Sequence, residues 1–249
     1  PRVITCHDVL AINTMLGKIQ ENSSRLMGSL LQKTILMGLK ATPRIICVSE
    51  NTKHELQQLV NCEGQKITTA VQPLNFKYEN ITEEKSLEVV HDMEEIKTID
   101  LKKGFILHIG GNQWYKNRNG VCKIYSKLHK LRSSKEQSNI PLVLAGKAPT
   151  FELLEFTKAN YHLNIIFIES PKNLELNALY NLASLLLFPS IKEGFGWPIV
   201  EAMACGCPVV TTGKNPMMEA GGNAAIYINP LDTKGAAEIT NEVLEWDDA

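Results

Sequence analysis

Short apolar runs alternate along the chain with segments whose apolar residues recur at helical spacing. This alternation is typical of strands and helices in a parallel α/β sheet. The first part of the chain predicts three strands and two helices, and Ser49 is placed to cap the second helix. The strands are expected at 3–5, 44–49 and 67–71, and the helices at 14–40 and 51–60.

The alternation continues from residue 105 and predicts a doubly wound parallel sheet. Five strands are expected at 105–109, 141–145, 165–168, 185–188 and 208–212, and helices at 121–131, 151–159, 174–181 and from Pro198. Between the two parts, residues 79–100 are charged, mostly acidic and without clear periodicity. We predict an α/β protein with a partial Rossmann-like domain at 1–76, a linker or hinge at 77–103, and a second Rossmann-like domain at 104–249.

The length of the chain favours an incomplete first domain. Two Rossmann-like domains of ordinary size need roughly 300 residues, whereas this chain has 249 residues and begins without Met. We therefore expect a fragment or a processed chain that lacks part of the N-terminal domain and the C-terminal end.

Composition narrows the functional classes. The formal net charge of −1 argues against nucleic acid as a partner, and no apolar run approaches the roughly 20 residues of a membrane span. The six cysteines are scattered, as is typical of reduced, buried thiols in a cytosolic protein. Cys205 and Cys207 form a close pair, but no second pair completes a zinc site, and we expect no metal.

The stretch 184–212 carries the strongest functional signal. An apolar strand leads into the glycine-containing loop 190–196 and then a helix that begins at Pro198, so Glu193 lies in the loop and Glu201 in the first turn. Such a junction offers unpaired N–H groups to a phosphorylated ligand, and its carboxylates can accept ribose or sugar hydroxyls. Alternatively, Glu201 only favours the helix dipole, or the two carboxylates form a glycosidase pair.

A second candidate site follows the strand at 105–109. Two glycines, ending with Gly111, precede the cations Lys116 and Arg118. This order suits a phosphate cradle in which Lys116 neutralises charge on a leaving diphosphate, although such cations are commonly just solvated. His7 follows the first strand and places a titratable ring at the mouth of that sheet, unless it is an ordinary loop histidine.

Glu193 and Glu201 resemble the two carboxylates of the E-x7-E motif of glycosyltransferase family 4. The surrounding residues 189–210 are similar to that family almost residue for residue. The resemblance covers nearly the whole chain, loosely in the first part and closely after Phe105, and is strongest to mannosyltransferase-like members. It implies a GT-B fold in which the first domain faces the acceptor and the second binds a nucleotide sugar.

The resemblance also implies roles for particular residues. Glu201 would bind the ribose hydroxyls and Glu193 would lie beside the donor sugar, while His7 would hydrogen-bond to the donor sugar or the acceptor. Further donor contacts would come from the backbone of Gly194, Phe195 and Gly196, from Gly111, and from Lys116, which matches the phosphate-binding lysine of the family. The preceding arginine of the family is absent, because Asn112 stands near its place, and Arg118 is a candidate substitute.

The reaction implied is a retaining transfer of a hexose, such as mannose or glucose, from a GDP- or UDP-linked donor without a further cofactor. The acceptor would be a saccharide or lipid-linked saccharide in cytoplasmic polysaccharide synthesis, at the inner face of the membrane, with peripheral contact through the missing N-terminal part. We expect the fragment alone to bind nucleotide but to transfer sugar poorly. Two alternatives are a phosphorylase-like or epimerase-like enzyme, for which no lysine is placed to hold pyridoxal phosphate, and a non-catalytic nucleotide-binding or scaffold subunit.

Overall fold

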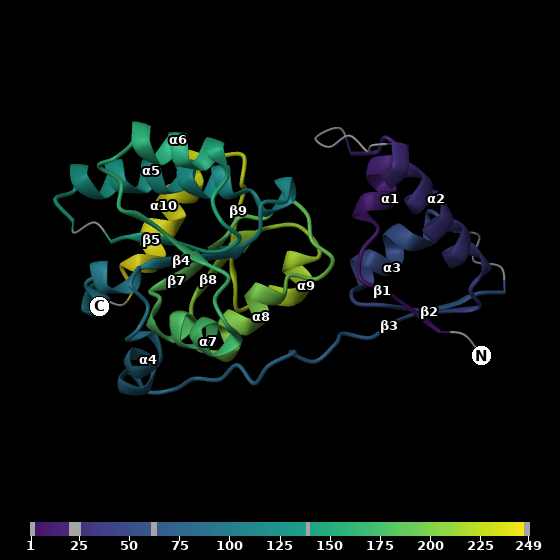
Figure 1. The fold of residues 1–249 in the computed structure, drawn as a ribbon, viewed down its shortest axis with the longest axis horizontal. Coiled ribbons are helices and arrows are strands. Elements are labelled where there is room, and N and C mark those ends of the chain that lie inside the picture. Colours follow the sequence, from purple (N-terminus) through teal and green to yellow (C-terminus); the bar gives the residue numbers. More distant parts are fainter. Residues whose placement is uncertain (1–2, 20–25, 61–63, 138–139, 247–249) are drawn as a thin grey trace. The chain divides into compact units, whose positions relative to one another are not determined.

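The computed structural model describes residues 3–19, 26–60, 64–137 and 140–246. The chain divides into two compact units, each with its own parallel sheet and helices (Figure 1). The first unit comprises Pro1–Pro73, Lys192–Gly196 and Lys214–Ala220, and the second comprises Leu74–Ile191, Trp197–Gly213 and Gly221–Ala249.

The first unit contains a three-stranded parallel sheet in the order β1-β2-β3. Ile45, Cys47 and Leu56 are completely shielded from solvent and form the centre of its small core. The strands are β1 (Ile4–Cys6), β2 (Arg44–Cys47) and β3 (Lys66–Thr69), and the helices are α1 (Leu10–Met15), α2 (Leu26–Ala41) and α3 (Glu50–Gln57).

Two expectations for this unit have different outcomes. The single helix expected at 14–40 is wrong, because α1 ends at Met15 and Gly17 adopts a left-handed φ of 71° before α2 begins; residues 20–25 of that expected helix lie outside the described ranges. The predicted cap is confirmed, since Ser49 Oγ accepts a hydrogen bond from the backbone N–H of Thr52 at 3.0 Å.

The second unit is built on a six-stranded sheet in the order β6-β5-β4-β7-β8-β9, with every neighbouring pair parallel. The predicted doubly wound parallel sheet is therefore confirmed, and a sixth strand extends the five that were expected. The strands are β4 (Ile106–Gly110), β5 (Leu142–Gly146), β6 (Ile165–Glu169), β7 (Leu185–Phe188), β8 (Val209–Thr212) and β9 (Ile226–Ile228).

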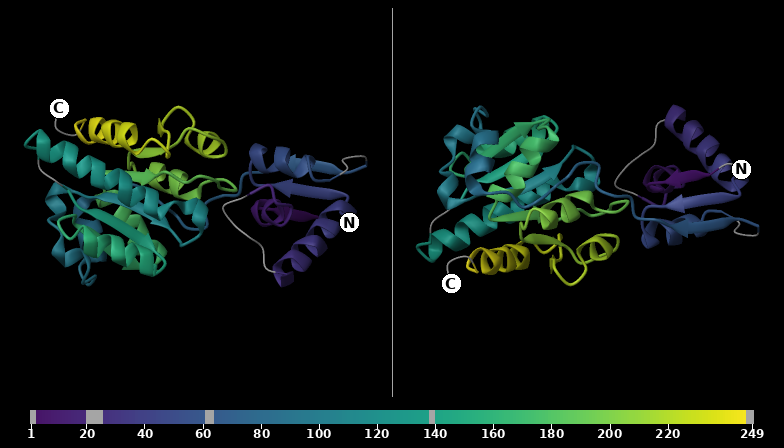
Figure 2. Two further views of the ribbon diagram at one scale, coloured as in Figure 1. Left: turned by 90° about the horizontal axis from the view of Figure 1, so that it is seen from above. Right: turned by 90° about the horizontal axis from the view of Figure 1, so that it is seen from below.

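Helices cover both faces of this sheet (Figures 1 and 2). On one face α5 packs along α10, and on the other lie α7 and α8, with α4 against α7. The helices of this unit are α4 (Glu83–Val90), α5 (Arg118–Ser134), α6 (Phe151–Ala159), α7 (Asn173–Leu182), α8 (Trp197–Ala204) and α10 (Thr233–Leu244), with short 3-10 turns at Ile96–Thr98, Leu101–Lys103 and Trp114–Lys116. The short helix α9 (Met217–Gly221) groups with the first unit except for its last residue.

The segment expected to link the domains contains regular structure. It includes α4, and the backbone N–H of Glu79 donates to Asn177 Oδ1 at 2.9 Å while Tyr78 stacks edge-on against Tyr180. These contacts tie the segment to α7, so it groups with the second unit from Leu74 onward. The hinge expected there stays a prediction.

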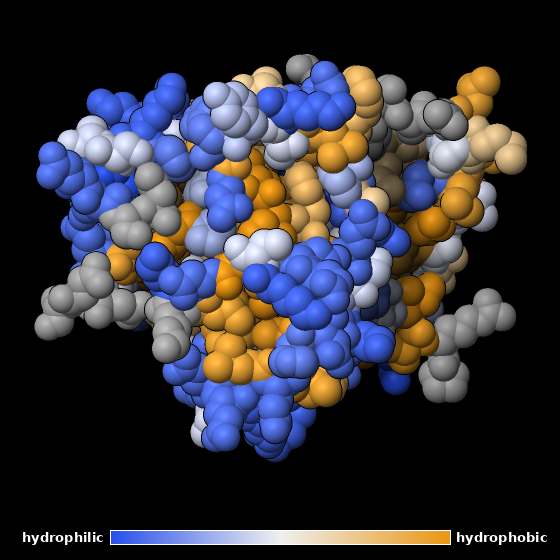
Figure 3. Space-filling model, turned by 60° about the vertical axis from the view of Figure 1, so that its left-hand side comes forward, coloured by the Kyte–Doolittle hydropathy of each residue, from blue (hydrophilic) through white to orange (hydrophobic). Residues whose placement is uncertain are grey.

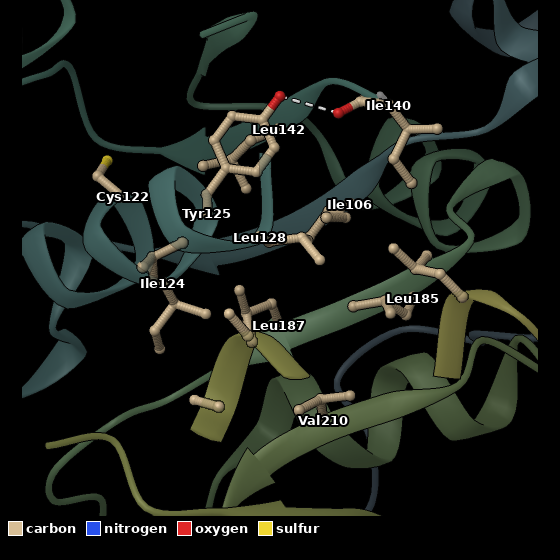
Figure 4. Close-up of a cluster of buried hydrophobic side chains, with 14 of the residues drawn as sticks. Ile106, Cys122, Ile124, Tyr125, Leu128, Ile140, Leu142, Leu185, Leu187 and Val210 are labelled. Carbon is tan, nitrogen blue, oxygen red and sulfur yellow. Dashed lines mark hydrogen bonds between the residues drawn. The ribbon is translucent and has the colours of Figure 1, made fainter. Parts of the chain in front are cut away.

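An apolar cluster supports the strands of the second unit (Figure 4). Leu185 and Leu187 of β7 lie in it, and all four side chains of this central strand are buried. The one polar tip in the close-up is satisfied, because the Tyr125 hydroxyl donates to the carbonyl of Ile140 at 2.8 Å. This packing fixes the carboxyl ends of β4 and β7, where the candidate site lies.

The surface carries both polar and apolar side chains (Figure 3). On α2, Leu26 and Met27 are 91% and 84% exposed. Among the described helices, none is long and apolar enough to cross a bilayer. The described cysteines, Cys6, Cys47, Cys122, Cys205 and Cys207, are buried as predicted, and Cys62 lies outside the described ranges.

Candidate functional site

The strand order of the second unit locates a switch point between β4 and β7. From β4 the chain proceeds outward through β5 and β6, and then returns to the other side of β4 to start β7, β8 and β9. In open parallel sheets, ligands bind at such a point, outside the carboxyl ends of the strands. Both motifs singled out in the sequence follow these strands: Gly111 and Lys116 follow β4, and Glu201 follows β7.

A cavity of about 380 Å³ opens at this edge of the sheet. Its walls come from the ends of three adjacent strands, β4, β5 and β6, and from the first turns of α7 and α8. The residues that line it are Ile109, Gly110, Gly111, Gln113, Lys116, Gly146, Lys147, Ser170, Pro171, Leu176 and Pro198. Glycine backbone, two lysines and a helix start together suit a phosphorylated ligand.

Hydrogen bonds fasten the loop after β4 to the loop after β7. The carbonyl of Tyr115 accepts from the Ser190 hydroxyl at 2.8 Å and from the N–H of Ile191 at 2.7 Å. Asn117, in the left-handed conformation at φ 56°, donates its side-chain amide to the carbonyl of Pro189 at 2.9 Å. The two loops that flank the switch point are therefore held in one arrangement, which preorganises Lys116.

Gly146 permits close approach of β5 to β4 at the cavity wall. Its φ is 135°, and a Cβ at this position would collide with the carbonyl oxygen of Gly110. We expect Gly146→Ala to lower the free energy of unfolding by about 2–4 kcal/mol, because strain and a backbone clash combine. Urea unfolding measures this, with Gly222→Ala as the control.

The control has a left-handed backbone but open space around it. Gly222 has φ 52°, and no heavy atom lies within 4 Å of the position that a Cβ would occupy. Its replacement should cost only about 1 kcal/mol. Equal losses of stability for the two variants would contradict a specific close approach at Gly146.

Glu201 is a buried carboxylate on α8, held by a tyrosine of α7. The side chain is 9% exposed, and the hydroxyl of the fully buried Tyr180 donates to its Oε2 at 2.8 Å. Burial raises the pKa of Glu201 above its ordinary value, while the Tyr180 hydrogen bond and the charge of Lys116 oppose this shift. Burial and the neighbouring carboxylate also raise the pKa of Tyr180, so it remains a donor.

Lys116 lies at the end of the 3-10 turn after β4 and lines the cavity. Its ammonium is 5.2 Å from the ring centre of Phe188 and 5.9 Å from that of Tyr115. Aromatic faces attract a cation without neutralising its charge. The geometry therefore places the Lys116 ammonium beside two aromatic rings at the wall of the cavity.

Arg118 is buried behind the loop. It is 4% exposed, and its Nη1 donates to Asn112 Oδ1 at 2.6 Å and to the carbonyl of Lys147 at 2.9 Å. The guanidinium thus lies beside Asn112 and joins the loop after β4 to the loop after β5, both of which line the cavity.

His108 on β4 is a buried imidazole close to the same loops. Its Nδ1 lies 2.9 Å from the carbonyl of Leu187, and burial, together with the charges of Arg118 and Lys116, lowers its pKa to about 3. The ring is therefore neutral near pH 7.

The remaining predicted residues fall in the first unit. His7 follows β1 and its side chain is exposed, whereas Glu193 and Gly194 are half-buried and Phe195 is 6% exposed. Gly196 adopts a φ of 104°, which explains a glycine immediately before α8. The structure thus brings Gly111, Lys116, Arg118 and Glu201 together in the second unit.

Several site residues were not singled out in the sequence. Tyr180 holds Glu201, and Ser170, with an unusual φ of 50°, lines the cavity beside Pro171. The position of Ser170 directly after a predicted strand was a usable signal, whereas Tyr180 looked like any aromatic residue of a buried helix face. Within the described ranges, no cluster of three or more His, Cys, Asp or Glu side chains could hold a metal ion.

Fold and site together define a Rossmann-like α/β protein with a ligand cavity at the switch point of its larger sheet. The family model of glycosyl transferases group 1 matches residues 90–247, and the chain belongs to this family. The GT-B expectation is also confirmed at the level of the fold: the structure of Anabaena Alr3699/HepE in complex with UDP-glucose superposes with a TM-score of 0.73 over 100% of this chain and 64% of that one, at 18% identity.

Two curated relatives are similar along most of this chain. O-antigen chain mannosyltransferase B of Escherichia coli is 26% identical over 81% of the chain, and O-antigen chain mannosyltransferase RfbU of Salmonella typhimurium is 24% identical over 100%. The chain spans 51% and 62% of the lengths of these two relatives.

Proposed function

We propose that the protein is a retaining glycosyltransferase that moves a hexose from a nucleoside diphosphate sugar to a hydroxyl acceptor. The observation that carries this proposal is the cavity at the switch point, where Lys116 and the start of α8 meet glycine backbone. Family membership supports the reaction class.

Each end of the donor has a chemical counterpart near this cavity. Glu201, when ionised, accepts hydrogen bonds from the ribose hydroxyls, and its bond from Tyr180 fixes the position of the carboxylate. Lys116 faces the diphosphate and stabilises the negative charge that grows on it as the glycosidic bond breaks. The N–H groups at the start of α8 act in the same direction.

Arg118 serves the donor by holding its loops. Through Asn112 and the Lys147 carbonyl it fixes two walls of the cavity, and its positive charge supplements that of Lys116. Gly111 allows the backbone to approach the phosphates closely.

The contacts to the sugar complete the proposal. Glu193 accepts hydrogen bonds from hydroxyls of the transferred hexose, and backbone N–H groups of Gly194, Phe195 and Gly196 donate to its oxygens. His7 hydrogen-bonds to the donor sugar or the acceptor. These assignments rest on the sequence motif. On the same basis, we propose that the reaction needs no further cofactor.

The comparisons suggest the substrate class. The relatives are named as O-antigen chain mannosyltransferases, and the fold neighbour binds UDP-glucose. We therefore propose polysaccharide or glycoconjugate synthesis, with a GDP- or UDP-linked donor and a saccharide or lipid-linked saccharide as acceptor.

Product analysis of the full-length protein tests this function. Incubation with GDP-mannose or UDP-glucose and a saccharide acceptor should give a product whose anomeric configuration, read by NMR coupling constants, matches that of the donor. Inversion would contradict the retaining mechanism. Nucleotide binding without any product or donor hydrolysis would instead favour a non-catalytic nucleotide-binding subunit.

The raised pKa of Glu201 predicts a pH dependence of nucleotide binding. Because the ionised carboxylate is the better acceptor, affinity should fall as the pH decreases through this pKa. Tyr180→Phe removes a hydrogen bond that lowers the pKa, so the loss of affinity should begin at a higher pH in this variant. Dissociation constants measured between pH 4 and pH 8 check this, and identical profiles for the two proteins would argue against the coupling.

A further inference from the structure

A second cavity, of about 330 Å³, lies beside the loop after β4, which also lines the donor cavity. Residues of this loop, including Trp114, and the first turns of α5 and α6 line the cavity. Gln113 lines both this cavity and the donor cavity. Asn119 and Glu152 contribute side chains from the two helix starts.

Arg118 lines this second cavity, and its guanidinium lies 5.8 Å from the ring centre of Phe167. The acceptors of its Nη1, Asn112 Oδ1 and the Lys147 carbonyl, are both neutral. Its Nε and Nη2 are shielded from solvent and have no hydrogen-bond partner among the described residues. Burial of a guanidinium is unfavourable unless a negative group offsets it, and burial accordingly lowers the pKa of Arg118.

Two helix N-termini add positive potential to the same space. The 17-residue α5 begins at Arg118, and its N-cap, Asn117, makes no side-chain bond to the first turn. The nine-residue α6 begins just after Thr150, whose hydroxyl accepts from the N–H of Leu153. The first turn of α5 is therefore not capped by its own N-cap side chain, and helix starts commonly bind anions.

The cavity also contains one opposing charge. Glu152, in the first turn of α6, is an exposed carboxylate. This one exposed carboxylate is opposed by the buried guanidinium of Arg118 and by the starts of two helices.

We propose that this cavity is a second anion-binding site, separate from the donor cavity. Its ligand is an oxyanion on a sugar, either a phosphate monoester or a carboxylate. The amide of Asn119 and the indole of Trp114 offer a hydrogen-bonding group and a flat apolar face to the sugar ring. The inference rests on the lining of this cavity and does not require the proposed transferase activity.

Two isosteric substitutions test the site in opposite directions. Asn119→Asp adds a negative charge to the cavity and should weaken binding of inorganic phosphate about tenfold, whereas Glu152→Gln removes one and should strengthen binding by a similar factor. An aspartate in the first turn of α5 also favours the helix dipole, so Asn119→Asp should remain folded. Circular dichroism on heating confirms the fold of both variants.

Binding is followed in the full-length protein by ¹H–¹⁵N chemical shifts during titration with phosphate, and in parallel with acetate. The expected result is saturable shifts at Asn119, Gly120 and Leu153, with the two variants changing the dissociation constant in opposite directions. Tighter phosphate binding would identify a phosphate monoester as the ligand group, and tighter acetate binding a carboxylate.

The proposal is overturned if neither anion shifts these amides, if shifts appear only at the donor cavity, or if the two variants leave affinity unchanged. Titration of the same samples with UDP and GDP distinguishes this outcome from failure of the donor site. Nucleotide binding that persists while phosphate shifts are absent would eliminate the second site alone.

Discussion

Replacing Glu201 by alanine is expected to weaken nucleoside diphosphate binding by about 100-fold or more. Two hydrogen bonds from ribose hydroxyls to a buried carboxylate would be lost, and hydrogen bonds to charged groups contribute about 1.5–3 kcal/mol each. The substitution also leaves the Tyr180 hydroxyl, which donates to Oε2 at 2.8 Å, without its acceptor. Isothermal titration of the full-length protein measures the change.

Tyr180→Phe is the matched control for this result. It retains the carboxylate and the ring, which stacks edge-on against Tyr78, and removes only the hydroxyl. We expect a loss of about fivefold to tenfold, because the orientation of Glu201 is relaxed while its charge remains. If Glu201→Ala bound nucleotide as tightly as Tyr180→Phe, the ribose assignment would be wrong.

Replacing Lys116 by alanine is expected to reduce the turnover of the full-length protein by about 100-fold to 1,000-fold. The positive charge is held near the donor cavity by a loop that hydrogen bonds fasten to the end of β7. Since charge on the diphosphate grows as the glycosidic bond breaks, removing Lys116 should lower kcat more than it raises KM. Steady-state kinetics with saturating acceptor separate these effects.

Lys116→Arg distinguishes charge from geometry. The variant keeps the positive charge but changes the shape of the donor group. We expect it to recover part of the lost turnover, with nucleotide affinity close to that of the parent protein. Unchanged kcat in Lys116→Ala would show that the diphosphate is stabilised elsewhere.

Much of the fold followed from local patterns. The run Leu185–Phe188 is apolar at every position, as is typical of a strand buried on both faces, and it forms the central β7. Gly206 follows α8 with a φ of 78°, the left-handed conformation in which a glycine commonly ends a helix. Ser49 capped its helix as expected because that bond spans only three residues.

Other elements gave weak local signals. β9 has three residues, too few for a period to be recognised. α4 contains many charged and few apolar positions, so the acidic segment was predicted to be a linker. The helix expected at 14–40 failed for a different reason. Its apolar spacing continues through Gly17, but this residue adopts a left-handed φ just after α1 ends. Apolar spacing alone does not reveal such a backbone conformation.

The candidate site was predictable in its motif and unpredictable in its contacts. The glycines and Glu201 indicated a strand-to-helix junction. The hydrogen bond from Tyr180 to Glu201 was not predictable in this way, because it joins residues on two different helices. Likewise, Arg118 was considered as a substitute for a missing arginine, and only the tertiary fold shows its Nη1 beside Asn112 and the Lys147 carbonyl. Such contacts depend on how α/β units stack, which local sequence does not encode.

The most direct test of the central claim is isothermal titration of the full-length protein and its Glu201→Ala variant with GDP, UDP, GDP-mannose and UDP-glucose. We expect saturable binding of one nucleotide and its sugar conjugate by the parent protein, with affinity about 100-fold weaker in the variant. Absence of binding to all four ligands, or equal affinity of the two proteins, would contradict a nucleotide-sugar site at the switch point between β4 and β7.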